Sequence, residues 1–484
     1  MTALRPTLRL LADDDVQRIV DQACRVLETA GALVENDEAR KLLRDAGANE
    51  KDGRVQLGEA LVRAAVESAP SRIAVYDRAG NLAMDLGDDR VHFDPGSAAI
   101  HIFDVDDNRR REVTTADAVA FARLVDGLPH YAAQATSLAP ADVPKEIADR
   151  YRLFLVLRNS TKPVITGTFA KSGFAPMQEM LSAVRGGAEA LREKPLAIFD
   201  CCPSPPLKWS DLTCQALIDC ARAGIPAELV SMPLTGATSP VTLREAVVQH
   251  CAENLSGVTI HQLAQQGAPI IYGGSPAAFD MRRGTTPMGA VETMMIDAAY
   301  AQVGKHLGLP THAYMGLSDA KCPDHQAGYE SGIGAVLAAL AGVNVVSGPG
   351  MLDFEMCQSL EKVLLDHDAV GLAHRLVRGI EQREGDAVDL IGELVGLSSF
   401  LGHPHTRENW RKDLTVASTL VDRDTYGDWE AKGSKWAHQR AQEEVQRRLE
   451  RAEILPLSDD VDAALWDIMF AEAKRHGVDA LPES

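Results

Sequence analysis

Leu309–Asp353 reads LPTHAYMGLSDAKCPDHQAGYESGIGAVLAALAGVNVVSGPGMLD, which has the pattern of strand, loop, helix, strand and loop. Leu309–Met315 contains enough β-compatible residues for a short buried strand. Ser318 or Asp319 is suited to cap the helix that follows, and Pro323 fits a first helical position. The stretch therefore predicts one complete strand–helix–strand unit.

One face of the predicted helix carries side chains at alternating steps of four and three, namely Gln326, Glu330, Ile333, Leu337 and Leu340. The three apolar members would pack on a sheet. Gln326 and Glu330 continue this stripe towards the carboxyl end of the strand, where α/β folds place their ligand sites. A glutamate there is either tied to the N–H groups of a neighbouring loop or aimed at a ligand, and the pattern leaves both open.

The same unit recurs along the chain. Strands are expected at Ala98–Phe103, Tyr131–Thr136, Val164–Thr168, Leu196–Cys201, Ala227–Ser231, Ile270–Gly273, Thr311–Met315 and Val343–Ser347. Helices are expected at Thr115–Asp126, Glu146–Arg158, Ala175–Arg185, Trp209–Ala223, Thr242–Gln266, Met288–Leu307, Asp324–Ala341 and Ser359–Glu381. Several strands follow a helix stop and a proline, as in Lys162-Pro163 and Lys194-Pro195. Eight such units, most spaced by about 30 residues, predict a (β/α)8 TIM barrel of the α/β class.

The first unit is the least defined of the eight. Ala98–Phe103 could instead pair with Arg111–Val113 as a hairpin, and another segment would then close the barrel. The structural rival is a doubly wound sheet, which usually shows a glycine-rich phosphate turn. Neither GxGxxG nor GxxxxGK[ST] occurs in the chain.

The flanks of the barrel differ from its repeats. We expect three regions: an N-terminal helical region with small strands (1–95), the barrel (96–382) and a C-terminal helical extension (383–484). Acidic and basic residues intermix between Trp429 and Arg451, as on a solvated helix. The extension is therefore expected to be a cap or a contact between subunits of a homo-oligomer.

Composition restricts the class of protein. The chain has 484 residues, of which 69 are acidic and 49 basic, giving a net charge of −20. This balance argues against nucleic acid or an anionic membrane as partner and admits a positively charged small molecule. The eight cysteines include no CxxC pair and predict free thiols. Because neither a signal peptide nor an apolar run of about 20 residues is present, a cytoplasmic protein is expected.

The loops after the strands are small, rich in methionine and poor in titrating groups, which favours a reaction with little proton transfer. A catalytic acid or base is therefore not expected. Metal ligation by His403 and His405 with Cys201 or Cys202 is a weak alternative, because tetrahedral sites need three or four convergent ligands. Lys321 could form a Schiff base if it were desolvated. No corrinoid-binding DxHxxG motif occurs in the chain.

Three stretches carry a resemblance to a known family: Ser318-Asp319-Ala320-Lys321 with Asp324-His325-Gln326-Ala327-Gly328-Tyr329-Glu330, Gly350-Met351-Leu352-Asp353 with Ser359-Leu360-Glu361-Lys362, and Phe400-Leu401-Gly402-His403-Pro404-His405-Thr406. With these motifs, and with Arg109–Asp117 and Trp429, the chain resembles the trimethylamine methyltransferase (MttB-like) superfamily from about residue 15 to about residue 470. The resemblance implies a (β/α)8 barrel that passes a methyl group from a methylated amine to the Co(I) corrinoid (cobalamin) of a separate small protein.

One departure from the family indicates the substrate class. Archaeal members that demethylate trimethylamine carry pyrrolysine, whereas this chain contains only standard residues. Members without pyrrolysine are associated with quaternary amines such as glycine betaine, proline betaine and carnitine. A quaternary ammonium is already a cationic leaving group, so it needs neither a proton nor an adduct, and a dry pocket favours the loss of its charge.

The expected pocket offers an aromatic ring or a carboxylate to the onium group and hydrogen-bond donors to a carboxylate. Tyr314 and Tyr329 are the aromatic candidates, and Glu330 would add counter-charge, although ordinary barrel packing explains each tyrosine as well. Further candidates for substrate binding on the same rim are His312, Gln326, Ser347 and Phe354, with backbone from Gly96 and Ser97. Gly273, Gly274 and Asp319 are candidates for contact with the corrinoid, and no metal ligand is expected.

Two functions from other classes stay open at this stage. One is a metal-dependent barrel lyase or hydrolase that uses His403, His405 and a cysteine. The other is a protein that binds quaternary amines without catalysis, which they would stabilise against heat.

Overall fold

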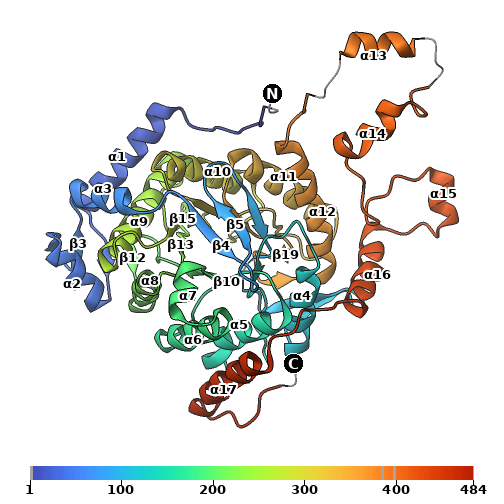
Figure 1. Ribbon diagram of the computed structural model, residues 1–484. Helices are drawn as coiled ribbons and strands as arrows, with labels where there is room; N and C mark the ends of the chain where they lie inside the picture. The colour runs from blue at the N-terminus through green and yellow to red at the C-terminus, as the bar shows by residue number, and fades with distance from the viewer. Residues whose placement is uncertain (1–3, 97, 383–385, 396–398, 483–484) are drawn as a thin grey trace.

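The computed structural model describes residues 4–96, 98–382, 386–395 and 399–482. Helices surround a central barrel of strands, and a helical arm stands away from one side of it (Figure 1). Ser97, which we expected to contribute backbone to the site together with Gly96, lies outside the described residues.

Eight parallel strands form the barrel in the order β6-β18-β17-β15-β13-β11-β10-β9. Their bounds are β6 (His92–Asp94), β9 (Gln134–Ala135), β10 (Val164–Thr166), β11 (Ala197–Cys201), β13 (Ala227–Leu229), β15 (Ile270–Gly274), β17 (Thr311–Tyr314) and β18 (Val345–Ser347). A parallel bridge between Phe93 and Tyr131 joins the two ends of this order, and the N–H of Ala132 donates to the carbonyl of Phe93 at 2.8 Å. The predicted (β/α)8 fold is confirmed.

Helices cover the outside of the barrel. They are α4 (Thr115–Asp126), α5 (Ala148–Asn159), α6 (Phe174–Arg185), α8 (Asp211–Ala223), α9 (Leu243–Ala264), α10 (Val291–His306), α11 (His325–Ala341) and α12 (Leu360–Val377). The expected cap of α11 was wrong by several residues. Asp324 caps this helix by accepting the N–H of Ala327 at 3.1 Å, because the side chains of Ser318 and Asp319 are held within the preceding loop.

The first barrel strand also differs from the expectation. The strand that closes the barrel is β6, whereas most of Ala98–Phe103 lies beyond it and leads into β7 (His101–Asp104). This strand forms an antiparallel hairpin with β8 (Arg109–Glu112), which is the alternative that the sequence left open. Strand β7 also pairs with β20 (Cys357–Gln358) at the carboxyl end of the barrel, so its apolar side chains pack there rather than between barrel strands.

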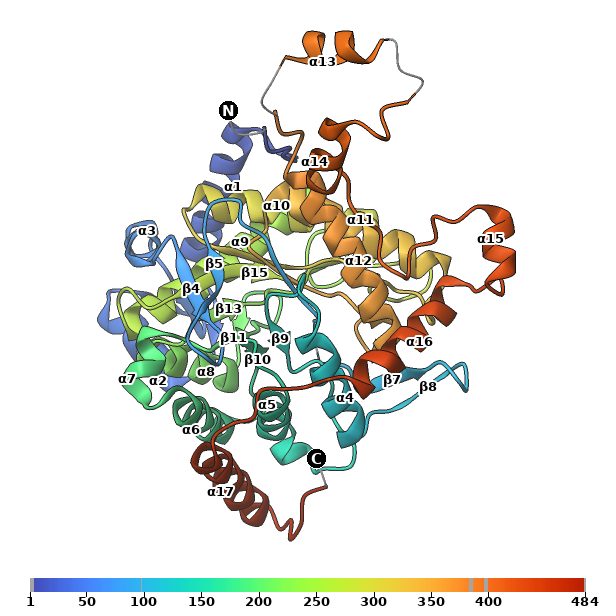
Figure 2. The same cartoon turned by 45° about the vertical axis from the view of Figure 1, so that its right-hand side comes forward.

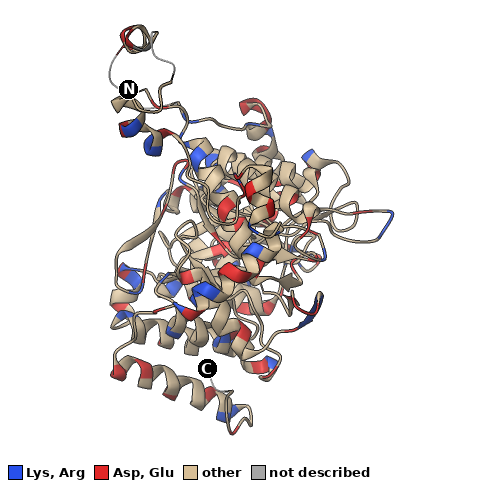
Figure 3. Ribbon diagram, turned by 90° about the vertical axis from the view of Figure 1, so that its right-hand side faces the viewer, with Lys and Arg blue, Asp and Glu red and all other residues tan. Residues whose placement is uncertain are grey.

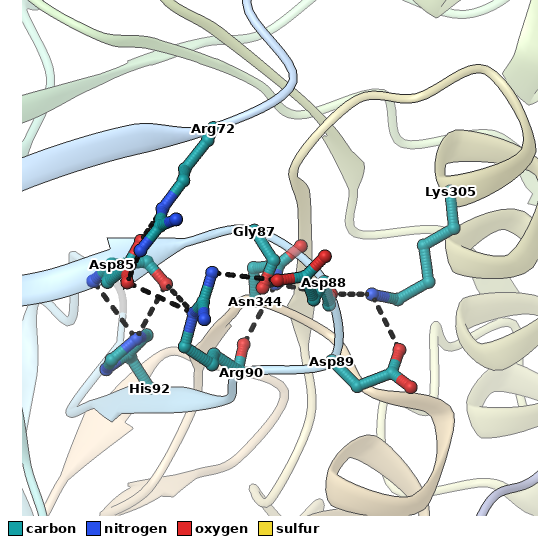
Figure 4. Close-up of polar contacts among 9 residues, drawn as sticks. All are labelled: Arg72, Asp85, Gly87, Asp88, Asp89, Arg90, His92, Lys305 and Asn344. Carbon is teal, nitrogen blue, oxygen red and sulfur yellow. Dashed lines mark hydrogen bonds and ion pairs between the residues drawn. The ribbon is translucent and has the colours of Figure 1, made fainter.

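A second hairpin closes the amino end of the barrel. Strands β4 (Ile73–Tyr76) and β5 (Leu82–Leu86) place an apolar face against residues from β10, β11, β15 and β18. Figure 4 shows the polar rim of this plug. There Asn344 donates to the backbone carbonyls of Gly87, Asp88 and Arg90 at 2.9–3.3 Å. Because this end is filled, a small molecule reaches the barrel interior from the carboxyl end.

The flanking segments pack on the outside of the barrel. Helices α1 (Asp13–Thr29), α2 (Asp37–Asp45) and α3 (Glu59–Ser68) contact α9, whereas α16 (Ala437–Glu450) contacts α12 and α17 (Asp459–Arg475) contacts α6. The chain between α12 and α16 forms the projecting arm, which contains α13 (Ala387–Leu394), α14 (Pro404–Asp413) and α15 (Tyr426–Ala431) (Figures 1 and 2). The division at residues 95 and 382 stays a prediction.

Both acidic and basic residues occur on the outer helices and in the arm (Figure 3). Among the described residues, no helix combines the length and the apolar character that crossing a membrane requires.

Candidate functional site

A cavity of about 310 Å³ lies at the carboxyl ends of the barrel strands. Its wall combines carboxylates with one arginine and two aromatic rings, contributed by Asp94, Arg152, Phe169, Asp200, Tyr314 and Glu355. Cavities at this end of a (β/α)8 barrel are the usual place of the active site. We had expected a site poor in titrating groups, and that expectation was wrong.

A larger groove of about 870 Å³ runs between α12 and residues 414–423. Its arginines are engaged within the protein: Arg375 donates to the carbonyls of Gly379 and Asp413, and Arg448 bonds Glu444. The barrel cavity is the better candidate, because each of its charged side chains keeps a buried polar atom that has no hydrogen-bond partner among the described residues.

Asp94 ends strand β6 and is completely buried. Its Oδ2 accepts a hydrogen bond from Ser347 Oγ at 2.8 Å, whereas its Oδ1 has no hydrogen-bond partner among the described residues. Burial raises the pKa of Asp94 well above its usual range. A buried carboxyl with one oxygen left without a hydrogen bond lowers the stability of the fold unless a ligand interacts with that oxygen.

Two further acids are paired across neighbouring strands. Asp200 on β11 is in register with Glu228 on β13. Burial and the proximity of Asp200 raise the pKa of Glu228 well above normal. Burial also raises the pKa of Asp200, opposed by Glu228, Arg152 and Tyr314. The pair therefore holds at least one proton at neutral pH.

His312 lies behind this pair rather than in the cavity. Its Nε2 is 3.3 Å from Glu228 Oε1, and both side chains are completely buried. Burial lowers the pKa of His312 to about 3, so the imidazole is neutral. The contact is consequently between two uncharged groups.

Glu355 reaches the cavity from a backbone turn between β19 (Met351–Leu352) and β20. The three consecutive residues Asp353, Phe354 and Glu355 have φ of 52°, 56° and 66°. Each such conformation costs about 1–3 kcal/mol for a residue other than glycine, and such costs concentrate at functional sites. The turn therefore holds Glu355 in place at the expense of backbone strain.

Cationic side chains clamp this turn from outside. Arg110 on β8 forms an ion pair with Asp353, and Lys321 Nζ lies 3.2 Å from Asp353 Oδ1 and 3.9 Å from the centre of the Phe354 ring. These contacts explain Lys321 as a support of the turn, and its covalent role stays an untested alternative. Phe354 faces Lys321 and is not part of the cavity wall.

The carboxyl of Glu355 itself is left free. Its Oε1 is buried and has no hydrogen-bond partner among the described residues. Burial, with the nearby charges of Asp319 and Asp200, raises the pKa of Glu355 to about 8. Perturbed acids that face a cavity are candidates for a binding function.

Arg152 is the one cation among the described residues of the cavity wall. It projects from α5, is 3% exposed, and its Nη1 donates to the carbonyl of Thr136 at 2.6 Å. Its guanidinium lies 4.4 Å from the centre of the Phe169 ring, at the mouth of the cavity. Burial lowers the pKa of Arg152 to about 10, so it keeps its charge at neutral pH.

Two of the side chains that we singled out line the cavity, Tyr314 and Ser347, and so does the backbone of Gly96. Tyr329 does not: it is 49% exposed on α11 and packs on His325. Gly273 and Gly274 serve packing behind the wall, because a Cβ on either would collide with His312 or with His250.

Glu330 is held inside a loop rather than in the cavity. It accepts hydrogen bonds from Ser318 Oγ, from the N–H of Asp319 at 2.9 Å and from Gln326 Nε2 at 3.0 Å. Asp319 in turn accepts the N–H groups of Met288 and Gly289, each at 2.9 Å. Gln326, Glu330 and Asp319 thus tie loops together, which is the structural alternative stated for Glu330.

The analysis of the sequence did not single out the charged residues of the wall. One of them, Asp200, had a recognisable signal, because it interrupts a buried apolar strand, as its neighbour Glu228 does behind the wall. An acid at such a position faces either the barrel interior or the helices, and both environments demand a partner. Arg152 and Glu355 had no comparable signal.

The alternative metal ligands do not converge. His403 begins α14 in the arm, where its Nδ1 accepts the N–H of His405 at 3.2 Å, while Cys202 lines the cavity. In the described part of the chain no three histidine, cysteine, aspartate or glutamate side chains gather as a metal site would require. The absence of a bound metal stays a prediction.

Comparison with known proteins gives a family match over almost the whole chain. The family model described as trimethylamine methyltransferase (MTTB) matches residues 1–477. A trimethylamine methyltransferase MttB of Desulfitobacterium hafniense (strain DSM 10664 / DCB-2) is 32% identical over 470 residues, covering 96% of this chain and 94% of the relative. A glycine betaine methyltransferase of Desulfitobacterium hafniense (strain Y51) is 30% identical over 480 residues, covering 99% and 100%.

Among solved structures, the monomethylamine methyltransferase (MtmB) of Methanosarcina barkeri is similar with a TM-score of 0.50. It is 12% identical in sequence and the match covers 92% of this chain and 94% of that chain. At this identity the likeness supports the fold alone.

Proposed function

The chain belongs to the trimethylamine methyltransferase family and is a methyltransferase, and on that premise we propose that it moves a methyl group from a quaternary amine to the Co(I) corrinoid of a separate small protein. The family resemblance stated from the motifs is confirmed. Glycine betaine or a relative such as proline betaine or carnitine is the substrate that we propose, since one relative is a glycine betaine methyltransferase.

The observation that carries this proposal is the set of unpartnered carboxyl oxygens around one small cavity, on Asp94, Asp200 and Glu355. A protonated tertiary amine would donate a hydrogen bond to one of them. A quaternary ammonium offers charge without any N–H, so it compensates carboxylates by electrostatics alone. Tyr314 adds an aromatic ring to the same wall, and rings attract such cations.

The raised pKa values of the wall help to reconcile binding with reaction. A fully ionised wall would stabilise the cationic substrate more than the transition state, in which the positive charge is being lost. Because burial and mutual repulsion raise the pKa values of Asp94, Asp200 and Glu355, the wall carries less than its formal charge. The substrate is then bound without being over-stabilised.

The chemistry needs little from this chain beyond binding. The corrinoid would supply the electron pair for the new bond to the methyl carbon, while the electrons of the broken C–N bond stay on nitrogen and leave a neutral tertiary amine. The wall positions the onium group, and the plug of β4 and β5 excludes water from the amino end.

The test is anaerobic incubation of the purified protein with cob(I)alamin and a single candidate amine, followed by absorbance. Glycine betaine, proline betaine or carnitine should give methylcobalamin, whereas trimethylamine should not. Failure with every quaternary amine would refute the proposal. Heat stabilisation by betaine without transfer to cobalamin or to any corrinoid protein would instead favour the non-catalytic binding protein.

We propose two further properties. A reducing, cytoplasmic setting suits a Co(I) acceptor and agrees with the eight free cysteines. Self-association into a homo-oligomer would cover apolar side chains of the arm such as Val388, Ile391 and Leu401, which are 56–86% exposed. Light scattering of the full chain and of a variant with charged residues at these positions tests the second property.

A further inference from the structure

We propose that Arg152 binds a carboxylate of the substrate, so that the methyl donor is a zwitterion whose onium group and carboxylate occupy different parts of one cavity. This inference rests on the proposed function and adds the residue that selects among quaternary amines. Choline-like cations, which lack a carboxylate, would fit only one part of the cavity.

The first argument is that Arg152 forms no close ion pair among the described residues, although the charges of Asp149 and Asp200 lie near enough to act on its pKa. Among the described residues no carboxylate oxygen lies within 4 Å of its guanidinium. The guanidinium donates one hydrogen bond, to the carbonyl of Thr136, and its Nε has no hydrogen-bond partner among the described residues. Buried arginines without a counter-ion are unfavourable, so such a side chain is expected to serve an anionic ligand.

Arg150, two residues away on the same helix, shows what a structural arginine looks like here. It is completely buried and pairs with Asp149 at 2.8 Å and with Glu472 at 2.9 Å. It also donates to the carbonyl of Glu146 and to Ser172 Oγ. Arg152 is nearly as buried as Arg150 but lacks this network, and it alone of the two lines the cavity.

The second argument is the geometry of the guanidinium. It lies 4.4 Å from the centre of the Phe169 ring, and its Nη1 is fixed to Thr136. These contacts hold the guanidinium while leaving N–H groups for a carboxylate, which the planar fork of arginine binds with two parallel hydrogen bonds. Phe169 is 48% exposed, so this end of the cavity faces the mouth.

The third argument is charge. One buried cation and several unpartnered carboxyls line the same small space without forming an ion pair closer than 4 Å among the described residues. A simple cation would satisfy the acids and leave Arg152 unpaired. A zwitterion satisfies both groups and adds no net charge to the cavity.

The experiment compares three ligands of similar size by titration calorimetry, with no corrinoid present. Glycine betaine has both charges, choline has only the cation, and 3,3-dimethylbutyrate has only the carboxylate. The wild-type protein should bind glycine betaine most tightly. Arg152→Met should weaken betaine by roughly 10- to 100-fold, which is the range for a charged hydrogen-bonded pair, and leave choline unchanged or tighter.

Two variants separate this role from a structural one. Arg152→Lys keeps the charge and should recover part of the betaine affinity but not the two-bond geometry. Arg150→Met removes a paired arginine and should lower the melting temperature, whereas Arg152→Met should not. Equal losses for betaine and choline in Arg152→Met, or no loss for either, would overturn the inference.

These results do not depend on methyl transfer. If betaine binds as described but no corrinoid is methylated, the proposed function fails while the role of Arg152 stands. If betaine is demethylated but Arg152→Met leaves the betaine-to-choline preference unchanged, the proposed function stands and the role of Arg152 is refuted.

Discussion

Glu355→Gln removes the one wall carboxyl that a strained turn presents to the cavity, and it should change both stability and cation binding with a defined dependence on pH. The pKa of Glu355 is about 8 in the native chain, against an ordinary 4.5. The native state therefore keeps a proton that the unfolded state has released, throughout the interval between these values. Stability must fall as pH rises across that interval, by about 1.4 kcal/mol per pH unit at most.

Glutamine cannot ionise, so the variant lacks this contribution. At pH 5 the wild type and Glu355→Gln should unfold at similar denaturant concentrations. At pH 8 the variant should be more stable, by about 2–3 kcal/mol once solvent at the open mouth is allowed for. Denaturant unfolding at a series of pH values measures this difference, with Glu67→Gln on exposed α3 as the control.

The affinity for a cation should rise with pH, whereas the stability of the fold falls with pH. In the wild type the affinity for a quaternary ammonium should rise between pH 6 and pH 9, because binding favours the ionised carboxyl and releases its proton. In Glu355→Gln this rise should be reduced, and at pH 6 the two proteins should bind almost equally. An unchanged pH slope in the variant, for unfolding and for binding alike, would refute the assignment of an unpartnered buried carboxyl at this position.

Three further changes test other parts of the structure. Lys321→Met should slow methyl transfer by loosening the turn without abolishing it, as measured by methylcobalamin formation. Complete loss of transfer with an unchanged melting temperature would restore a covalent role for Lys321. Asp94→Asn should weaken the binding of a quaternary ammonium, as measured by calorimetry. The melting temperature should stay unchanged or rise, because the substitution removes a buried ionisable group. A lower melting temperature with unchanged binding would mean that the role of Asp94 is structural. Met84→Ala in the barrel plug should lower the free energy of unfolding by about 2–5 kcal/mol without altering betaine affinity, and a large affinity change would mean that the plug shapes the site.

Much of the fold was predictable because it repeats. Helix stop, proline and apolar strand recur often enough that one missed unit does not change the class. The misassigned unit was β6, which was expected as one of the small strands of the N-terminal region and not as a barrel strand, because His92 and Asp94 make it short and polar at both ends. The neighbouring Ala98–Phe103 is more apolar, but it continues past the barrel mouth, and tertiary pairing with β20 rather than local pattern decides its place.

The site was predictable where a residue ends a barrel strand, as with Tyr314 and Ser347. Most of the charged wall was not predictable, because Asp94 comes from a strand assigned to the flank, Arg152 from a helix and Glu355 from a strained turn. Arg152 lies on α5, which is buried on nearly every side, so no polar face distinguishes it. Glu355 reaches the cavity only because three consecutive residues adopt positive φ. The residue types of Asp353-Phe354-Glu355 do not predict that conformation.

A crystal structure of the full chain with glycine betaine bound would test the central claim most directly. We predict the trimethylammonium group among Asp94, Asp200 and Glu355, beside Tyr314, and the carboxylate within hydrogen-bonding distance of Arg152. Betaine bound elsewhere on the molecule, or bound in the cavity with its carboxylate away from Arg152, would contradict the account.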